Sequence, residues 1–569
     1  MEKEEKVVVR SRLRRTQQTA LIKVSSLLVP LIFFINARHI QWVYRQQNAN
    51  LQYISNVIDS SVSYEGRSGN VRRGNNPDGV PVMSVAILTY KNSLLVGKLL
   101  ESVLEQKTEF TYEILVTDNG CRPETKATLN RILNDATVQH KYLPLCTNPG
   151  YAIGNNEGVE KLAHPQSKWI LFLNDDVQLQ PKFLQYMYDM AELKAPQAVG
   201  VGCKVLSEDS SKLIEAGSLV WNQGGTGGYA RDRTDIDASD LMYARPVDYV
   251  SGVCFMMEHQ AFVSYGGFDH KNFPNYYEDT DLQMHIQHDL DAEVWYQPLA
   301  IANHHEHGSF GQSDAVRLME KGAEVFRNKW KDHLPEHVFP NLDQWERSLL
   351  LASDIRSRLP NKVNLLYLDE RIPNIKTRSH SNIMALNNLH HRVALSTIKD
   401  EAQDDCTFVC KTNITQSGVE VVTPREMSLR SFLLENRQDF YQVVVASQRY
   451  TMDNMQDILR MGRQSPQGFS IIFDCGPDEC GLKYPPVWLD LVDVIIVPNE
   501  KERQAVFAMM NKQTQDVLLI ESPPTKPPSL LQRLVGSTAS SGGLNVTKLE
   551  EDWSKAVSMA VSRRAGRVA

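Results

Sequence analysis

The sequence predicts an α/β fold with two domains, each built on a sheet covered by helices. Strand-like apolar runs alternate with helical segments from Val82, and the same alternation starts again at Lys362. Such alternation is typical of a parallel sheet. The 569 residues also exceed what one hydrophobic core usually supports. With 42% hydrophobic and 23% charged residues, the composition excludes collagen-like, mucin-like and wholly disordered proteins.

Charge and cysteine content exclude several other classes of protein. Lys and Arg number 61 against 68 Asp and Glu, which gives a net charge of −7. This balance predicts no binding of nucleic acid over the whole surface, although a local basic patch stays open. Eight cysteines are too sparse for a disulfide scaffold, and none forms the C-x-x-C pair of zinc ribbons or thioredoxins.

The N-terminal region resembles a marginal signal-anchor. The apolar stretch Val24–Ile35 follows several basic residues but is short, because a membrane span needs about 17–25 apolar residues. We expect an anchor at about 21–36 behind a cytoplasmic tail, with the rest of the chain in the Golgi or ER lumen. A cleaved signal peptide and an amphipathic helix are the alternatives. The sequons at Asn413 and Asn545 fit a lumen but are weak evidence.

The first domain is expected at 82–334, after a stem at 46–81 that is rich in Asn, Ser, Gly and Arg. Its strands and helices are recognised from apolar runs and helical spacing. In order, they are a strand at Val82–Tyr90, a helix at Leu94–Gln106, a strand at Tyr112–Thr117, a helix at Glu124–Asn134, a strand near His140–Leu145, a helix from near Gly154 and a strand at Trp169–Leu173.

Polar clusters follow three of these strands, at Thr89–Asn92, Asp118–Gly120 and Asn174–Asp176. Ligands of parallel sheets bind at the carboxyl ends of strands, so the coincidence favours a binding site. Polar turns after strands explain each cluster singly, but they explain the acidic bias of two clusters less well.

The Asn174-Asp175-Asp176 cluster has the oxygen ligands that a hard divalent cation prefers. Such a cation would bridge the carboxylates to a diphosphate and offset its charge on departure. Asn and Asp are also common turn residues, so this short motif alone is weak.

A second acidic cluster, Glu278-Asp279-Thr280-Asp281, opens a helix. A carboxylate in a cleft can act as a general base that takes a proton from an attacking hydroxyl. The alternative is that the acids only complement the helix dipole. Crowding of the acids raises their pKa, whereas the helix N-terminus lowers it.

Two further clusters carry polar groups suited to ligands. The segment His304–His307 contains three histidines and a glutamate, so a zinc site is one possibility. No H-E-x-x-H helix is present, and a single histidine that completes a carboxylate site is more economical. The glycine-rich segment Asn148–Gly158 opens a helix whose free N–H groups suit a phosphate or sugar hydroxyls, unless it is only a flexible turn.

Taken in order, these clusters resemble the family 2 glycosyltransferases of the GT-A fold, and most closely the rhamnosyl- and galactofuranosyl-transferase-like branch. The resemblance covers about Val82 to Gly311. It rests on the segments SVAILTYKN, EILVTDNG, NPGYAIGNNEG, WILFLNDDVQLQP, VDYVSGVCFMMEHQAFVSYGGFDHKNFPNYYEDTDLQMHI and YQPLAIANHHEHGSFG.

The resemblance implies a role for each matching residue. Donor-binding positions are Thr89, Asp118, Asn148, Gly150, Asn156 and Asp175. Metal-binding positions are Asp176, Asn174 and His304, with His305 and His307 as fallbacks. Asn174 replaces the first acid of the family's D-x-D motif, so metal binding depends mainly on Asp176. Asp279 is the expected catalytic base with Glu278 beside it, and Trp221, Gly252 and Asp281 lie on the acceptor side.

The resemblance also implies the reaction. A hexosyltransferase of this kind moves a sugar from a nucleotide-sugar donor to a hydroxyl of a glycan or glycoconjugate, with Mn²⁺ or Mg²⁺ and inversion of the anomeric carbon. Three other functions stay open. They are an inactive glycosyltransferase-like binding protein, a zinc hydrolase using the histidines, and a nicotinamide oxidoreductase, which lacks the expected G-x-G-x-x-G motif.

The second domain is expected at 362–569, after a linker at 335–361. Its strand-like runs are Val363–Asp369, Tyr441–Ser447, Phe469–Asp474 and Val492–Pro498. They faintly resemble the first half of a GT-B glycosyltransferase. Without a glycine-rich phosphate loop, we expect a non-catalytic domain. The pairs Cys406/Cys410 and Cys475/Cys480 could be disulfides or buried thiols.

Overall fold

The computed structural model describes most of the chain after residue 78. The described residues are 79–134, 136–306, 312–356, 362–375, 377–399, 406–423, 428–431, 433, 440–447, 458, 460–461, 468–475, 492–497, 501, 503–504, 506, 516–519 and 546–568. The predicted anchor at about 21–36 and almost all of the predicted stem lie outside them. Among the described residues, no helix combines the length and the apolar character that crossing a bilayer requires.

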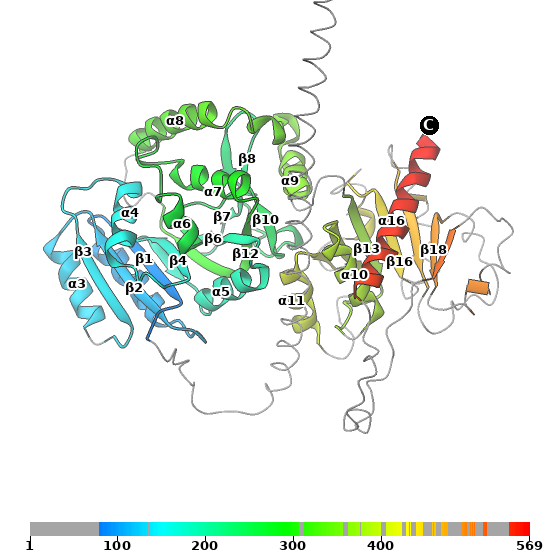
Figure 1. The fold of residues 1–569 in the computed structure, drawn as a ribbon, viewed down its shortest axis with the longest axis horizontal. Helices are drawn as coiled ribbons and strands as arrows, with labels where there is room; N and C mark the ends of the chain where they lie inside the picture. Colours follow the sequence, from blue (N-terminus) through cyan, green and yellow to red (C-terminus); the bar gives the residue numbers. More distant parts are fainter. Residues whose placement is uncertain are drawn as a thin grey trace, which may run out of the picture. The chain divides into compact units, whose positions relative to one another are not determined.

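The predicted strands of the first domain form the parallel part of a mixed sheet (Figure 1). They are β1 (Met83–Thr89), β2 (Tyr112–Asp118), β3 (Gln139–Pro144) and β4 (Trp169–Asn174). The order is β4-β1-β2-β3, and all neighbours run parallel. Thr89 pairs with Asp118, and Leu88 pairs with Asn174. The register therefore brings the three predicted polar clusters to one edge of the sheet.

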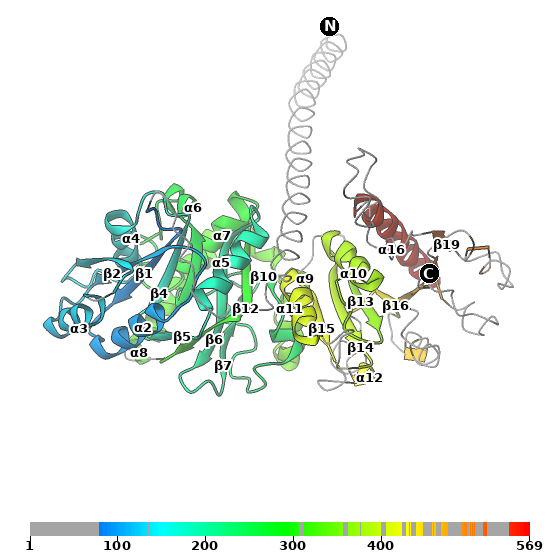
Figure 2. The same cartoon turned by 90° about the horizontal axis from the view of Figure 1, so that it is seen from below.

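Helices cover both faces of this parallel part. The three are α2 (Ser93–Leu104), α3 (Pro123–Leu133) and α4 (Tyr151–Leu162). The chain moves outward from β1 to β3 and then returns to β4 on the other side of β1. Because crossover connections are right-handed, the returning helix α4 must lie on the face opposite α2 and α3. Figure 2 shows this arrangement.

Further strands extend the sheet beyond β4. The strand β11 (Cys254–Glu258) is antiparallel to both β4 and β6 (Ala198–Ser207), and β12 (Glu293–His304) pairs with β6 in parallel. The remaining strands of this part are β5 (Val177–Leu179), β7 (Leu213–Ala216), β8 (Ser218–Val220), β9 (Thr226–Gly228) and β10 (Arg245–Val247). The predicted α/β fold is thus confirmed, and the antiparallel strands are additions to the predicted parallel pattern.

Helices fill the rest of this part of the chain. They are α5 (Phe183–Lys194), α6 (His259–Ser264), α7 (Glu278–Asp289), α8 (Gln312–Lys329) and α9 (Trp345–Arg356), with short 3₁₀ turns η1 (Ser239–Leu241), η2 (Leu334–Glu336) and η3 (Leu342–Gln344). Helix α9 lies inside the segment expected as a linker, and its Leu349 and Ala352 belong to the same apolar core as Phe172 and Phe255.

The second predicted domain contains an all-parallel sheet of seven strands. Its order is β15-β14-β13-β16-β17-β18-β19. The strands are β13 (Asn364–Asp369), β14 (Arg392–Thr397), β15 (Glu420–Val422), β16 (Val443–Ser447), β17 (Ser470–Asp474), β18 (Val494–Val497) and β19 (Asp516–Leu519). Described helices are α10 (Arg378–Asn388), α11 (Thr407–Ser417), α12 (Leu429–Ser431) and α16 (Val546–Val568). The predicted α/β character is present, and Trp553 of α16 is fully buried against this sheet's core.

Cysteines form two disulfides among the described residues. The Cys406–Cys410 pair, one of the alternatives left open by its spacing, is bonded. The second, Cys121–Cys146, joins the turn after β2 to the turn after β3 and was not predicted. Cys480 lies outside the described residues.

Candidate active site

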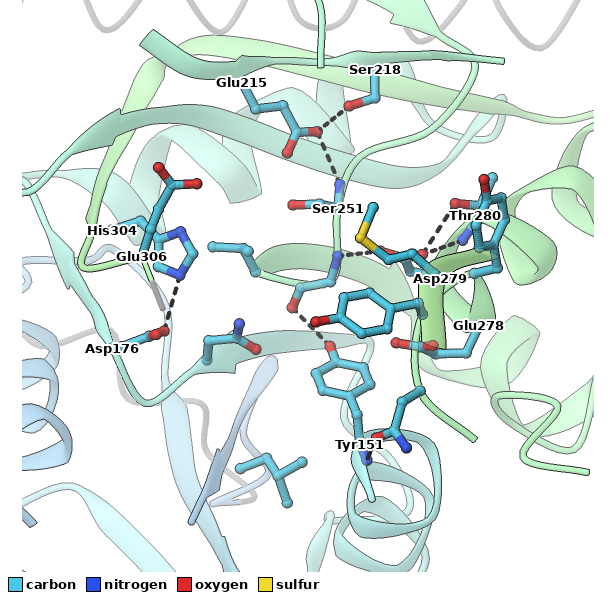
Figure 3. Close-up of a pocket in the computed structure, with 18 of the residues that line it drawn as sticks. Tyr151, Asp176, Glu215, Ser218, Ser251, Glu278, Asp279, Thr280, His304 and Glu306 are labelled. Atoms are coloured by element: carbon cyan, nitrogen blue, oxygen red, sulfur yellow. Dashed lines mark hydrogen bonds and ion pairs between the residues drawn. The ribbon is translucent and has the colours of Figure 1, made fainter. Parts of the chain in front are cut away.

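The predicted site residues gather around one pocket of about 660 Å³, at the carboxyl ends of β1 and β4. This volume is in the range of ligand pockets in proteins. Most predicted residues line it, namely Thr89, Asn148, Gly150, Asn174, Asp175, Asp176, Gly252, Glu278, Asp279 and His304. Figure 3 shows Asp176 and His304 on one side of this central pocket and Glu278 and Asp279 on the other.

The Asp176–His304 pair results from strand register. His304 is the last residue of β12 and pairs with Val177, the first residue of β5. It therefore lies next to Asp176, the residue that directly precedes β5. Nε2 of His304 lies 3.1 Å from Oδ1 of Asp176, and both side chains are nearly buried. Of the three predicted histidines, His304 is the one placed at the pocket. His305 bonds to Glu208 on an exposed surface, and His307 lies outside the described residues.

This pair fits a divalent cation. Two ligand atoms bound at right angles to an ion at about 2.1 Å lie about 3 Å apart, close to the separation found here. Nδ1 of His304 is buried and has no hydrogen-bond partner among the described residues, so the polar contact of the ring is that of Nε2 with Asp176. Asn174 lines the same part of the pocket and could add an oxygen ligand.

Asp175 points to the end of β1 instead. Its Oδ2 accepts hydrogen bonds from the Thr89 hydroxyl at 2.6 Å and the Tyr90 N–H at 3.1 Å, and Oδ1 accepts one from Asn92. Burial raises the pKa of Asp175 to about 6, although the Thr89 hydrogen bond opposes the shift. Asp175 thus fastens the turn after β4 to the turn after β1.

A strained turn aims the second acidic cluster into the pocket. Tyr276 and Tyr277 both have left-handed backbone, with φ of 65° and 71°, immediately before α7 begins at Glu278. This conformation costs a non-glycine residue on the order of 1–3 kcal/mol, and such strain concentrates at functional sites. The predicted helix start is confirmed, with Glu278, Asp279 and Asp281 in the first turn.

Asp279 is held by three donors. Its Oδ2 accepts the Gly252 N–H at 2.6 Å, and its Oδ1 accepts the Thr280 N–H at 2.6 Å and the Thr280 hydroxyl at 3.1 Å. Burial raises the pKa of Asp279, and these hydrogen bonds oppose the rise. The carboxylate is therefore fixed in orientation while its affinity for a proton is increased.

Glu278 differs from Asp279 in its hydrogen bonding. It is 5% exposed, and its Oε2 has no hydrogen-bond partner among the described residues. Burial, followed by the nearby Asp279 charge, raises the pKa of Glu278 well above its usual value. The first turn of α7 thus presents two neighbouring carboxyl groups with different affinities for a proton.

A further carboxyl group in the pocket, that of Glu215, had no sequence signal. Glu215, on the short strand β7, accepts hydrogen bonds from the Ser251 N–H at 2.9 Å and the Ser218 hydroxyl at 2.8 Å. Tyr151 at the start of α4 donates its hydroxyl to the Gly252 carbonyl at 2.7 Å. Together they hold the segment 251–252, whose N–H reaches Asp279 (Figure 3).

Two residues predicted to bind the donor do not line the pocket. The Asp118 carboxylate accepts hydrogen bonds from the N–H groups of Gly120 and Cys121 and from the Tyr142 hydroxyl. These bonds stabilise the turn that follows β2. The Asn156 side chain bonds to both backbone groups of Phe268. Their donor-binding roles stay predictions without support from this geometry.

Two residues predicted on the acceptor side also lie away from the pocket. Trp221 is 5% exposed and packs against Trp345, with ring centroids 5.2 Å apart. Asp281 is buried and accepts hydrogen bonds from Lys329 at 2.8 Å and from the Trp330 indole at 2.8 Å. Both side chains hold the fold together in this structure.

A mixed sheet with this pocket at the carboxyl ends of its parallel strands is a GT-A-like glycosyltransferase fold. Residues 84–262 match the family model described as "Glycosyl transferase family 2", so the chain carries a domain of glycosyltransferase family 2. The match ends before α7, so Asp279 and His304 lie outside the matched residues.

Curated relatives are bacterial. "N-acetylglucosaminyl-diphospho-decaprenol L-rhamnosyltransferase" of Mycobacterium tuberculosis is 28% identical over 264 residues, which cover 42% of this chain and 80% of the relative. "O-antigen biosynthesis protein RfbC" of Myxococcus xanthus is 25% identical over 201 residues, 34% of this chain and 15% of that protein. Among solved structures, "GalNAc-T7 with UDP, GalNAc and Mn2+" aligns with a TM-score of 0.35 and 14% identity, covering 47% of this chain and 53% of that one.

These relatives correct the predicted location. The expectation of a single-pass type II protein in the Golgi or ER is wrong, because the curated relatives that the chain matches are bacterial proteins. The family resemblance of the rhamnosyltransferase-like branch is confirmed.

Proposed function

We propose that this chain transfers a sugar from a nucleotide-sugar donor to a hydroxyl group of a glycan or glycoconjugate, and that it inverts the anomeric carbon. The observation that carries the proposal is the placement of the Asp176–His304 pair and of Asp279 on opposite sides of one pocket. A single displacement needs the leaving group and the attacking hydroxyl on opposite faces of the sugar, and this placement suits both.

Asp279 is the proposed general base. As the acceptor oxygen forms its bond to the anomeric carbon, the bond from that carbon to the diphosphate breaks, and the hydroxyl proton passes to the Asp279 carboxylate. The Gly252 and Thr280 N–H groups fix the carboxylate's direction, and burial increases its affinity for the proton.

Asp176 and His304, with Asn174, are the proposed ligands of Mn²⁺ or Mg²⁺. Such an ion offsets the negative charge that develops on the departing nucleoside diphosphate. Asn148 and Gly150 are the proposed donor-binding residues at the N-terminus of α4, and their position in the pocket lining supports this role.

Donor chemistry can be tested by binding. UDP, GDP and dTDP, each with and without Mn²⁺, are screened for a rise in melting temperature, because ligands that bind only the folded state stabilise it. We expect one nucleotide to give a rise that Mn²⁺ enlarges and that Asp176→Asn removes. The matching nucleotide sugars, including a nucleotide-activated L-rhamnose chosen because of the Mycobacterium tuberculosis relative, then serve as donors.

The base assignment is tested by Asp279→Asn. Loss of a general base typically costs about 10²–10⁴-fold, so we expect a loss of kcat in this range with nucleotide binding retained. The matched control is Asp289→Asn in the last turn of the same helix, which does not line the pocket. Near-wild-type transfer by Asp279→Asn would remove the assignment. Nucleotide binding by the wild-type chain with no transfer to any acceptor would favour the inactive, sugar-binding alternative.

For the second α/β domain we propose a role without catalysis, in acceptor binding or assembly. It is supported by the position of the proposed catalytic residues, which all lie in the first sheet domain.

A further inference from the structure

A second cluster of metal-binding side chains lies outside the central pocket. It consists of His288 in the last turn of α7, His333 before the 3₁₀ turn η2, and Glu336 at the end of that turn. One ligand atom from each residue lies within 4.8 Å of the other two. None of the three lines the central pocket.

Local structure explains why these side chains meet. His333 and Glu336 are three residues apart on a 3₁₀ turn, where side chains at this spacing lie above one another. The backbone N–H of Glu336 bonds to the His333 carbonyl at 3.0 Å, which closes the turn. The two histidine rings lie with centroids 4.1 Å apart, and Trp330 packs against both with centroids at 5.6 Å. The indole therefore restricts both imidazoles.

From this geometry we infer a zinc site formed by His288, His333 and Glu336, with the fourth position left to water. Two imidazoles and one carboxylate favour Zn²⁺ over Mg²⁺ or Ca²⁺, which prefer oxygen ligands. Ligand atoms around a tetrahedral Zn²⁺ lie about 3.4 Å apart, so small side-chain rotations bring the three atoms into range.

The ion ties α7 to the segment after α8. His288 lies near the C-terminus of α7, while Glu278 and Asp279 form the N-terminus of the same helix. Residues 333–336 follow α8, which ends at Lys329. Zinc at this position therefore stabilises the helix that presents the proposed base, at a distance of about 15 Å from the chemistry.

The site is tested with Co²⁺ as a spectroscopic substitute for zinc. The full chain, free of any histidine tag and stripped of metal, is titrated in the Asp176→Asn background to weaken metal binding in the central pocket. We expect one Co²⁺ per chain with the visible absorption of a four-coordinate ion, and Zn²⁺ is expected to displace it and raise the melting temperature.

Ligand variants decide the assignment. His288→Gln, His333→Gln and Glu336→Gln are each expected to lower the Co²⁺ affinity at least about tenfold, the loss caused even by removing a partner of a metal ligand. His140→Gln, an exposed histidine on β3, is the matched control and is expected to keep full affinity.

Unchanged affinity in the three variants, or no four-coordinate absorption in the parent, would overturn the site and leave an aromatic packing cluster. If a histidine variant fails to fold, Glu336→Gln still decides, because Glu336 is exposed. The result is independent of the proposed transfer reaction. Transfer is tested by the activity of Asp279→Asn, whereas the zinc site is tested by Co²⁺ binding to the variants of this cluster.

Discussion

At the scale of single residues, Glu278 and Asp279 show how neighbours in one helical turn acquire different chemistry. Asp279 has three hydrogen-bond donors, whereas Oε2 of Glu278 has none among the described residues. Donors stabilise the ionised form, and burial without donors favours the neutral form. The pair therefore separates into Asp279, whose hydrogen bonds oppose the rise of its pKa by burial, and Glu278, whose pKa is raised well above its usual value by burial and by the Asp279 charge.

The raised pKa of Asp279 predicts a pH dependence. A base acts only when deprotonated, so kcat/KM should fall as pH decreases through the Asp279 pKa, at a midpoint above the ordinary value for Asp. Thr280→Val removes one donor to the carboxylate, so it should move this midpoint to higher pH. The profiles are measured as kcat/KM against pH, with Asp289→Asn as control. A midpoint that stays in place in Thr280→Val would mean that another group titrates.

Asp175 predicts a pH dependence of stability. Its pKa of about 6 in the folded state exceeds the 3.8 of an unperturbed aspartate, so the folded chain binds the extra proton and stability falls as pH rises between these values. The difference between a pKa of about 6 and the unperturbed 3.8 corresponds to about 3 kcal/mol. Asp175→Asn should therefore become more favourable relative to wild type, by up to about 3 kcal/mol, between pH 4 and 7.5. Denaturant unfolding at both pH values checks this, and an equal difference at both would contradict it.

Most of the site residues predicted from the sequence line the pocket, because parallel strands bring their carboxyl ends to one edge. Asp118 stays a predicted donor-binding residue that does not line the pocket. Its carboxylate bonds to its own turn, and an Asp after a strand can serve either a turn or a ligand. Glu215 was missed because its neighbours Ser251 and Asp279 come close only through the antiparallel strand β7, and LIEAG has no recognisable pattern.

At the scale of elements, helix α4 lies unusually close to the sheet. Added Cβ atoms at Gly154 and Gly158 would lie 2.6 Å from Leu88 and 2.3 Å from the Thr117 hydroxyl. These glycines let the helix that begins at the pocket pack tightly on β1 and β2. The sequence suggested phosphate or sugar binding for the glycine-rich segment, and the structure adds this packing role.

Gly158→Ala should therefore destabilise the first domain. Alanine stabilises a helix by about 1 kcal/mol relative to glycine, whereas overpacking costs about 1–3 kcal/mol. Because of the close contact with Thr117, we expect the cost of overpacking to exceed the gain. Thr117→Ala removes the clashing oxygen and should rescue the variant. Gly225→Ala, where the nearest atom to an added Cβ is 3.8 Å away, is the control. Unfolding midpoints in denaturant provide the comparison, and a stabilised Gly158→Ala would contradict the close packing.

At the scale of the whole molecule, two sheets of different construction share one chain. The first mixes parallel and antiparallel strands and carries the central pocket, whereas the second is parallel throughout. The alternation of strands and helices predicted both. It missed β14, β15 and β19, because a short apolar run is not distinguished from a buried helix by periodicity.

Ligand binding should affect the two sheets differently. Hydrogen exchange of the full chain is measured with and without the best nucleoside diphosphate and Mn²⁺. Slower exchange is expected at Asn174–Asp176, at the start of α7 and near His304, because a bound ligand lowers local opening. Peptides of β13 and β14 should exchange at the same rate in both samples. Protection confined to the second sheet would place the nucleotide site there instead.

The hydrogen bond from Gly252 to Asp279 has an evolutionary consequence. Its donor belongs to the main chain, which every residue except proline supplies, so inherited side-chain changes around it leave the bond intact. Tyr249, Ser251 and Thr226 also line the pocket, and their side chains are open to such drift. If Asp279 is the base, as proposed, new acceptor preferences can arise there by single-codon steps while its carboxylate keeps its orientation.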